Sequence, residues 1–560
     1  MIDPIEAAAG AGPAPIRYRV RVGVTGHRSL RHPDAVAGRV SEILDSAIDR
    51  LFDEPAPRDS RVTPWAFTVV TALAEGADRL VAREVLRTPE SGIEVILPLA
   101  REDYLEDFET GDSRREFDEL CARATGERAV ECMGGSRSGM PGRGPDARGA
   151  AYLRAGRTVV ERCDVLIALW DGTPARGTGG TGEIVAYARE VGRPIVIVSD
   201  EEHPTVAVQL GEPLRAGALR RMEVFNTFEP PERERRAYEE NAYRGMFEAS
   251  GAEAVAEGAK RAVRERLIPY YVCASLIAKR NKRRHARAGL LAYLLSPAAV
   301  AAVAIGALVH SAALVGGAVE LALLATILVV LFYADRQKVH KQWIEARFVA
   351  ERVRSAMFCV ACGLAPSRTG VPPWLLHTGG ADAWAFRAGD EIARRLGALP
   401  PADPAACAAL RTFVQRVWLD EQIRFHERRS SELGGVSRWL ESAGQWTFVA
   451  ALGAAALHVG LTALGPGASL RTLERPVVFL ALVLPAIGAS IGGIRTHREY
   501  SRLERRHQAM AGILRHLRER SSAVESLEEL NALLREAEGV MLQESGEWLA
   551  LMRYARIQAA

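Results

Sequence analysis

The 560-residue chain lacks an excess of charge of either sign. It carries 72 lysines and arginines against 69 aspartates and glutamates, a formal net charge of +3. Nucleic-acid binding depends on many cationic contacts to phosphate, so this balance gives no electrostatic support for a nucleic-acid partner. A chain of this length has room for about three or four domains.

Cysteines are also few, with seven in the whole chain. Cys359 and Cys362 form a single CxxC pair, but no second pair follows at the spacing of a zinc site. No pattern predicts a disulfide framework, and reduced cytosolic thiols are the better interpretation. The sequence therefore predicts neither a metal site nor a resident cofactor.

The N-terminus lacks the features of a secretory signal. Residues 1–15 have no positively charged start and no apolar stretch. We expect this segment to be disordered and not to act as a signal peptide.

Apolar sequence is abundant and is concentrated in two hairpins. Gly289–Val309 and Ala313–Tyr333 are separated by a few residues, and Trp446–Leu464 and Pro476–Ile494 repeat the arrangement. A helix needs roughly 20 apolar residues to cross the hydrocarbon core, and soluble core helices are usually shorter. The sequence thus predicts an all-α membrane domain with four transmembrane helices.

Basic residues flank these hairpins on one side. Lys279–Arg287 precedes the first apolar segment, Arg336–Lys341 follows the second, and Arg495–Arg506 follows the fourth, whereas the two short turns carry few. By the positive-inside rule, both termini and the middle segment face the cytoplasm. We expect a multi-pass protein of the inner (cytoplasmic) membrane.

Residues 16–230 alternate short β-rich runs with amphipathic helical patterns. This alternation predicts an α/β head with a doubly wound parallel sheet of Rossmann-like type, whose ligand crevice lies at the carboxyl ends of the strands. The expected strands are Tyr18–Thr25, Phe67–Ala72, Ile93–Pro98, Asp164–Trp170 and Pro194–Ser199. The expected helices are Ala35–Phe52, Ala77–Arg87, Ala150–Arg162 and Gly182–Val191.

Three polar clusters follow these strands, and the first is Gly26, His27 and Arg28. Glycine lets backbone amides approach a phosphate closely, and an arginine can bind it through two hydrogen bonds. The alternative interpretation is a tight turn that carries a surface arginine.

The second cluster is Glu75, Gly76 and Asp78, between the second strand and its helix. Either carboxylate could accept hydrogen bonds from ribose hydroxyls. Asp78 has the alternative role of a helix N-cap, which we favour for it, with a ligand contact assigned to Gly76.

The third cluster contains Asp171, Gly179, Gly180, Thr181 and Glu183, in a glycine-rich loop that runs into a helix. Such a loop is a prepared anion site because it combines free amides with the helix dipole. Glu183 has the alternative role of a cap that complements the dipole.

The three clusters together resemble the SLOG superfamily, which includes the LOG phosphoribohydrolases, the DprA-like proteins and nucleotide sensors of bacterial conflict systems. The resemblance covers about residues 17–200. Gly179 to Glu183 corresponds to the LOG motif PGGxGTxxE, without its proline and one spacer residue. The same loop is similar to that of nucleoside deoxyribosyltransferases, in which a catalytic carboxylate follows the glycine-threonine turn. Both resemblances imply a nucleotide-derived ligand, and Glu183 as the catalytic residue if the head is an enzyme.

Gly134–Gly149 is rich in glycine, serine, proline and arginine, which predicts a mobile loop. A basic lid over phosphates and a plain disordered insertion are both compatible with this composition.

Helical patterns flank the expected spans. Apolar residues recur at steps of three and four through 339–357 and again through 500–517, which predicts cytoplasmic helices that pack along heptad seams. We expect a helical linker at 231–285, a first two-span unit at 286–360, a cytoplasmic connector at 361–425 and a second two-span unit at 426–560. Each two-span unit has the same order of a basic segment, a span, a short turn, a second span and a charged helix, as expected for a degenerate repeat.

This half resembles the SLATT class of membrane effectors, which are commonly linked to SLOG sensors. The segments that carry the resemblance are Ala274–Ala278, Trp343–Arg352, Trp418–His426 and Glu544–Trp548. Together the two resemblances imply a nucleotide-signal sensor coupled to a pore-forming or membrane-disrupting homo-oligomer in bacterial defence, with the lipid bilayer as its target. The alternatives are a membrane-tethered N-glycosidase or deoxyribosyltransferase and a structural scaffold.

Overall fold

The computed structural model divides the chain into two compact units. The head unit is Met1–Glu229 with Ala365–Leu399, and the helical unit is Pro230–Leu364 with Pro400–Ala560. The chain therefore passes between the units three times. The structure describes residues 13–54, 62–124, 130–132, 145–174, 177–209, 211–214, 216–248, 251–366, 384–397, 399, 401–463, 468–497 and 499–552.

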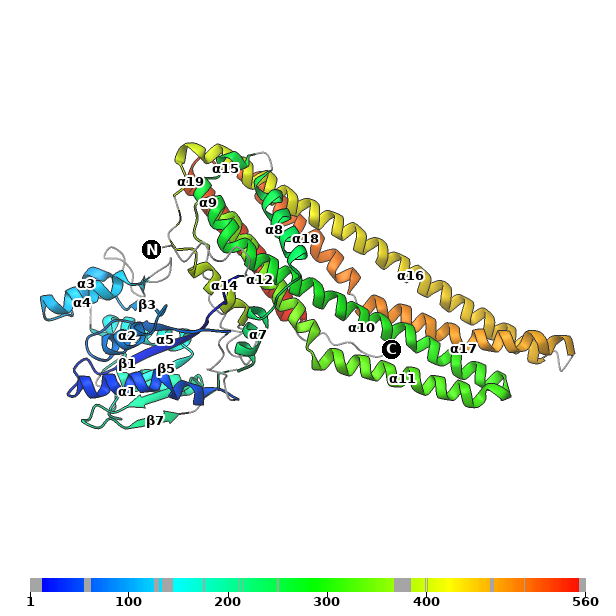
Figure 1. Cartoon of the computed structure of the whole chain (residues 1–560), viewed down its shortest axis with the longest axis horizontal. Coiled ribbons are helices and arrows are strands. Elements are labelled where there is room, and N and C mark those ends of the chain that lie inside the picture. The colour runs from blue at the N-terminus through cyan, green and yellow to red at the C-terminus, as the bar shows by residue number, and fades with distance from the viewer. Residues whose placement is uncertain are drawn as a thin grey trace. The chain divides into compact units, whose positions relative to one another are not determined.

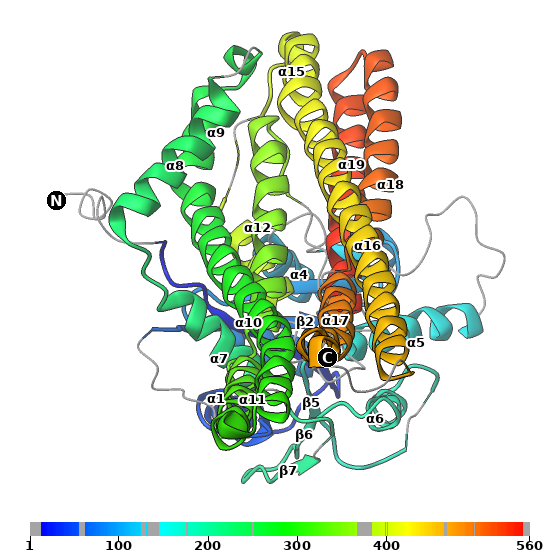
Figure 2. The ribbon, with the colours of Figure 1, turned by 90° about the vertical axis from the view of Figure 1, so that its right-hand side faces the viewer.

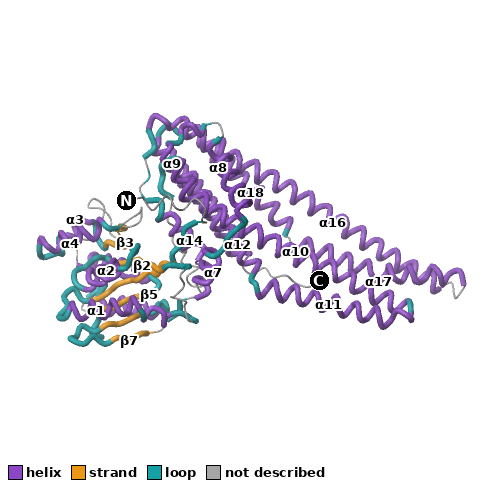
Figure 3. The backbone as a smooth tube through the Cα atoms, viewed as in Figure 1, coloured by secondary structure: helices purple, strands orange, loops and turns teal. Residues whose placement is uncertain are grey.

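A seven-stranded sheet forms the centre of the head unit (Figures 1 and 3). Its order is β4-β3-β2-β1-β5-β6-β7, so the strand order reverses between β1 and β5. The strands are β1 (Tyr18–Gly26), β2 (Trp65–Thr71), β3 (Gly92–Leu97), β4 (Val130–Cys132), β5 (Val165–Leu169), β6 (Ile195–Val198) and β7 (Val206–Gln209). The five expected strands are confirmed, and β4 and β7 are additions.

The expectation of a wholly parallel sheet is wrong at one edge. β7 pairs with β6 in the antiparallel direction, with Ile195 opposite Gln209. β7 is only partly buried, whereas all five residues of β5 are buried. A half-exposed edge strand of four residues has no continuous apolar run, which is why its sequence gives little signal.

Four helices pack against the sheet because each has an apolar side: α1 (Pro33–Asp45), α2 (Ala77–Arg87), α5 (Pro145–Arg162) and α6 (Thr181–Glu190). The head unit also contains α3 (Arg101–Leu105), α4 (Gly111–Ala122) and α7 (Ala216–Asn226). α1 contacts α2, and α5 contacts α6. Right-handed crossovers place these pairs on opposite faces of the sheet. Of the loop expected at 134–149, residues 134–144 lie outside the described residues, and Pro145 to Gly149 begin α5.

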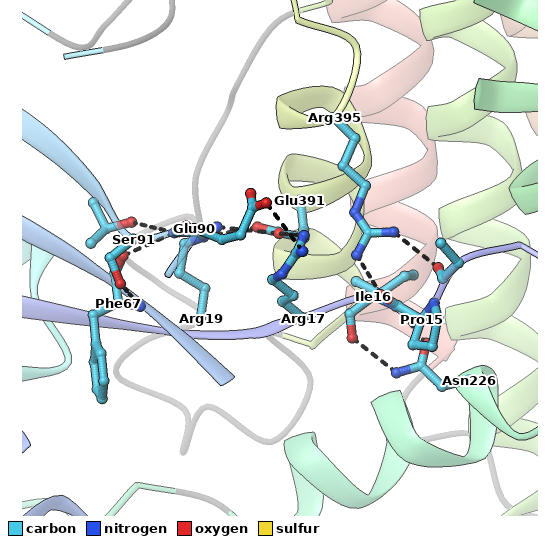
Figure 4. Close-up of polar contacts among 12 residues, drawn as sticks. Pro15, Ile16, Arg17, Arg19, Phe67, Glu90, Ser91, Asn226, Glu391 and Arg395 are labelled. Atoms are coloured by element: carbon cyan, nitrogen blue, oxygen red, sulfur yellow. Dashed lines mark hydrogen bonds and ion pairs between the residues drawn. The ribbon is translucent and has the colours of Figure 1, made fainter. Parts of the chain in front are cut away.

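An eighth helix of the head unit comes from far along the chain. α14 (Trp384–Arg394) packs on β1 and on α7. Figure 4 shows its carboxylate Glu391, which binds Arg19 of β1 through two hydrogen bonds of 2.8 and 3.2 Å. Residues 365–399 thus belong to the head unit, and this divides the connector that we expected at 361–425.

A buried ion pair also fastens α14 to the sheet. Arg387 donates to both carboxylate oxygens of Asp164, at 2.8 and 2.5 Å, and to the carbonyl of Arg19. Although burial alone would raise it, the Arg387 guanidinium lowers the pKa of Asp164. Asp164 directly precedes β5, so the pair lies at the amino ends of the strands.

The helical unit is built on two long helices (Figures 1 and 2). α10 (Ile268–Leu308) packs on α11 (Ala313–Arg336) and α12 (Val339–Ala361), and α16 (Asp420–Ala463) packs on α17 (Ala468–His497) and α18 (Tyr500–Arg520). The remaining helices are α8 (Glu232–Phe247), α9 (Glu257–Ala262), α15 (Cys407–Phe413) and α19 (Leu527–Met552). α12 also packs on α19.

The two halves of this unit repeat two irregular features. A π-helical turn precedes each long helix, at Val263–Leu267 and at Val414–Leu419. A non-glycine residue with positive φ separates each apolar helix from the helix after it, namely Lys338 and Glu499. Shared irregularities of this kind are what a duplicated unit would retain, and they support the degenerate repeat.

The heptad seams are partly confirmed. In α18, the residues His507, Met510, Leu514 and Leu517 are buried along one face. α12 is different, because it packs between α10 and α19 and buries residues on most of its surface, including Phe348 and Val349 off the expected seam. It is a central helix of a bundle and not one strand of a two-stranded coil.

Four helices are long and apolar enough to cross a membrane, which agrees with the sequence. Within their apolar windows, between 6% and 33% of the residues are buried. Leu314, Leu321 and Trp446 are 87%, 69% and 71% exposed. Soluble proteins rarely expose contiguous apolar surface on this scale, so lipid or other subunits must cover these helices.

Candidate functional site

A cavity of about 510 Å³ lies at the carboxyl ends of the strands, where the strand order reverses between β1 and β5. This is the position at which open α/β sheets bind ligands, and the volume suits a small molecule. Of the residues predicted from the sequence, seven line it: Gly26, His27, Arg28, Asp78, Gly179, Gly180 and Thr181.

The glycine-rich loop and the start of α6 form one wall. Gly179 has φ of +84°, and a side chain there would lie 2.8 Å from the backbone nitrogen of Leu153. Glycine is therefore required for the loop to lie against α5. Thr181 and Gly182 are the first residues of α6, and their backbone N–H groups make no hydrogen bond to the described residues. Such unsatisfied donors attract an anion.

Glu183 points back into its own loop. Its carboxylate accepts a hydrogen bond of 2.8 Å from the backbone N–H of Gly179, and the residue is absent from the cavity lining. It is the third residue of α6, where a carboxylate also complements the helix dipole. The capping interpretation of Glu183 therefore has direct support.

Two glycines let the first and second clusters meet. A side chain at Gly76 would lie 2.3 Å from the carbonyl oxygen of Arg28, and one at Gly26 would lie 2.5 Å from Ala77. Ala77 also donates its backbone N–H to the carbonyl of His27 at 3.0 Å. Gly76 thus holds the loop of Arg28 in place and does not itself line the cavity.

Asp78 lines the cavity and organises the loop before α2. Its carboxylate accepts hydrogen bonds from the Thr71 hydroxyl at 2.8 Å and from the backbone N–H groups of Ala72 and Ala74. Asp78 does not cap its own helix, since Gly76 is the N-cap residue. Burial raises the pKa of Asp78 to about 6. The cap expected for Asp78 is therefore wrong, and Gly76, for which we expected a ligand contact, is the N-cap residue outside the cavity lining.

The other two predicted carboxylates are held outside the lining. Glu75 accepts a hydrogen bond from the hydroxyl of Ser113 in α4. Asp171 accepts two from Thr173, which lower the pKa of Asp171 to about 2, and lies 3.3 Å from the His27 imidazole. Asp171 therefore shapes the rim of the cavity next to Thr173, which lines it.

Sequence reasoning missed an aromatic wall of the cavity and the Asp107 carboxylate that contacts it. Tyr104, Tyr152 and Trp170 line the cavity, and the Tyr152 hydroxyl donates to Asp107. Asp107 also lies 3.8 Å from Arg28, whose guanidinium is 5.6 Å from the centre of the Tyr152 ring. Tyr104 and Asp107 come from the segment after β3, and Tyr152 comes from α5, where no glycine motif marks them. Trp170, at the end of an expected strand, was the one available signal.

Family models, curated proteins and solved structures were compared with this chain, and no match was found.

Proposed function

We propose that this protein is a ligand-gated membrane effector. A SLOG-like, Rossmann-like head binds a nucleotide-derived signal, and SLATT-like four-span subunits associate as a homo-oligomer in the inner membrane of a bacterium. Ligand binding then opens or distorts the bilayer as a defence response. The observation that carries this proposal is the cavity, where the unsatisfied N–H groups of α6 face a half-exposed Arg28 beside aromatic rings.

The cavity offers a phosphate and a base different surfaces. Two backbone donors and a guanidinium suit a phosphate, because each hydrogen bond to it is charge-assisted. The rings of Tyr152 and Trp170 suit a planar base. Arg28 is half exposed and its ion pair with Asp107 is long, at 3.8 Å, so a turn toward an anion costs this weak pair and the contact with the Tyr152 ring.

A route from ligand to membrane helices follows from the chain itself. β1 carries Gly26 at its carboxyl end, in the cavity, and Arg19 near its amino end, under α14. α14 is joined by chain to α12 on one side and to α15 on the other. A ligand that favours one arrangement of β1 would shift the population of α14 positions.

The rival function is a membrane-tethered enzyme that cleaves or transfers an N-glycosidic bond. It needs the Glu183 carboxylate as acid or nucleophile at the ligand. The hydrogen bond from Gly179 to Glu183 favours a structural role instead.

The decisive variant is Gly180→Asp. Gly180 is the N-cap of α6 with φ of −71°, so aspartate fits the backbone and is a favoured cap. Its negative charge would occupy the anion site. We expect at least a hundredfold loss of nucleotide affinity by calorimetry, and loss of nucleotide-dependent dye leakage from proteoliposomes. Gly38→Asp is the control, since Gly38 faces open space on α1.

Two outcomes would contradict this function. Unchanged affinity in a folded Gly180→Asp protein would place the ligand elsewhere. Chromatography of the nucleotides should show no consumption by the wild type, and Glu183→Gln should retain leakage because glutamine keeps one acceptor for Gly179. If the wild type consumes nucleotide and Glu183→Gln abolishes both turnover and leakage, catalysis is part of the mechanism.

A further inference from the structure

The cavity of the head unit, the head cavity, contains a buried hydroxyl group without a partner. Tyr104 belongs to α3 and borders this cavity, although its side chain is fully buried. Its Oη has no hydrogen-bond partner among the described residues. A buried hydroxyl that makes no hydrogen bond destabilises a fold, and phenylalanine would fill the same space without that cost. The packing of the head therefore does not explain why this residue is a tyrosine.

The ring of Tyr104 is held on the side away from the cavity. The ring centres of Phe108 and Phe117 lie 5.0 and 5.9 Å from that of Tyr104, both in edge-on contact, and neither residue borders the cavity. Burial and the negative charge of Asp78 raise the pKa of Tyr104 well above its usual range. The hydroxyl therefore keeps its proton and is able to donate it in a hydrogen bond.

Asp78 contributes an unused acceptor at the same end of the cavity. Its three hydrogen bonds, from the Thr71 hydroxyl and from the backbone N–H groups of Ala72 and Ala74, all end on Oδ2. Oδ1 accepts no hydrogen bond from the described residues, and Asp78 borders the cavity. The three donors also fix the carboxylate in place. One acceptor and one donor are thus held ready without binding each other.

We propose that Tyr104 and Asp78 bind the vicinal hydroxyls of a ribose, which rests on the proposed function and narrows its signal to a ribonucleotide. One hydroxyl donates to Oδ1 of Asp78 in a charge-assisted hydrogen bond, and its neighbour accepts from the Oη of Tyr104. A deoxyribose lacks one of the two groups. A site built to bind a hydroxyl rejects an analogue without it, because a buried polar group is then left unpaired.

The burial of the two groups favours a sugar over the edge of a base. Tyr104 and Asp78 are 0% and 6% exposed, whereas the rings of Tyr152 and Trp170, which suit a planar base, are partly exposed. Only one oxygen of Asp78 is unused, so the two adjacent N–H donors of a guanine edge would find one acceptor. A vicinal diol needs one acceptor and one donor, which are the two groups present.

The test measures nucleotide affinity by calorimetry with the full chain in nanodiscs. The probes are the four common ribonucleoside 5′-diphosphates and their 2′-deoxy counterparts. The buffer is at pH 8, where Asp78 is ionised because burial raises its pKa only to about 6. We expect the ribonucleotide that binds most tightly to bind at least about tenfold more tightly than its deoxy counterpart, as one hydrogen bond to a charged group implies.

Two variants and a matched control assign this preference to the site. Tyr104→Phe removes the donor and Asp78→Asn removes the charge, so each should reduce the ratio of the two affinities at least threefold. Tyr187→Phe loses a tyrosine hydroxyl as well, but that hydroxyl donates to Glu161 and Tyr187 does not border the cavity. This control should keep the ratio of the wild type within a factor of two.

Thermal unfolding of the ligand-free proteins separates a ligand-binding role from a structural one. Tyr104→Phe should leave the unfolding temperature unchanged or raise it, because it removes an unpaired buried hydroxyl while it lowers ribonucleotide affinity. A lower unfolding temperature for Tyr104→Phe would show that the hydroxyl has a partner within the fold and would overturn the proposal.

The affinities also distinguish failure of this site from failure of the proposed function. If each ribonucleotide and its deoxy counterpart bind the wild type equally, and Gly180→Asp abolishes both, the proposed function stands and the ribose site is rejected. If Tyr104→Phe weakens both members of a pair by the same factor, the hydroxyl contacts a base and the ribose site is again rejected. If no nucleotide binds the wild type, the proposed function fails and the ribose site fails with it.

Discussion

At the residue scale, the absence of a side chain at two glycines determines which polar groups face the head cavity. Glycines at 26 and 76 bring two loops into backbone contact, and Asp78 then binds three donors of the β2–α2 connection. Arg28 is left half exposed beside Tyr152. The site is therefore assembled by close packing of loops, and its charged groups are positioned by backbone donors.

Asp78 makes the stability of the head depend on pH. Burial raises its pKa to about 6 from an ordinary 3.8, so the folded state binds the proton more tightly than the unfolded state. The contribution of Asp78 to the free energy of unfolding is then greatest below about pH 4 and falls as pH rises to about 6, by about 3 kcal/mol.

Asp78→Asn should remove this dependence, because asparagine keeps an acceptor but does not titrate. Thermal unfolding of the full chain in detergent, from pH 4 to pH 7, measures it. The wild type should lose stability relative to Asp78→Asn over that interval and not beyond it. A constant difference across the interval would show that Asp78 ionises freely.

At the scale of elements, α14 is the unexpected feature. It follows a helical stretch and a segment rich in proline and glycine, yet it packs on β1 and buries the Arg387–Asp164 pair. No local sequence pattern predicts that α14 packs on β1, because the apolar face of a short amphipathic helix can pack against any apolar surface of the fold. Residues 365–399, part of the connector expected at 361–425, are in fact a structural part of the head.

Arg387→Met should uncouple the head from the membrane helices. It leaves Asp164 buried with Arg21 N–H as its remaining described donor, which destabilises the attachment of α14 by about 3 kcal/mol. The pair lies at the amino ends of the strands, so nucleotide affinity should change by less than threefold while ligand-dependent leakage is lost.

Arg395→Met is the control for this experiment. Arg395 belongs to the turn that follows α14 and donates to the exposed carbonyls of Ala14 and Pro15. Proteoliposomes with the Arg395→Met protein should show the same ligand-dependent dye leakage as the wild type. If Arg387→Met also responds normally, α14 does not transmit the signal.

At the scale of the whole molecule, four exposed apolar helices and the basic segments around them are the basis of the expected membrane topology. The largest exposed side chains, such as Leu314 and Trp446, lie in the expected spans. The Lys279–Arg287 and Arg495–Arg506 segments lie next to the apolar helices, and the positive-inside rule predicts a cytoplasmic location for them.

Reporter fusions can test this arrangement directly. Fusions at residue 1 and at residue 560 should report a cytoplasmic position. Four spans leave both termini on the same side of the membrane, which is also the side of the basic segments. A fusion after Ser311, in the turn between α10 and α11, should report the opposite side. An external signal from either terminus would refute the four-span topology.

The sequence by itself determined the elements whose signal is local. Continuous apolar runs identified the five central strands and the four long helices, since burial on all sides or in lipid demands such runs. The glycine-rich loop before α6 could also be predicted from the sequence, because a positive φ at Gly179 and close backbone packing require glycine.

Only the tertiary structure decided how distant groups meet. The partners of Arg28, the turn of Glu183 toward Gly179, the attachment of α14 and the place of Tyr104 in the cavity wall all join residues by contact in space. Side chains that are ordinary in sequence gain their function there from burial and from charges contributed by other helices. The electrostatic interaction between two charges depends on their distance in space, and the sequence alone does not give that distance.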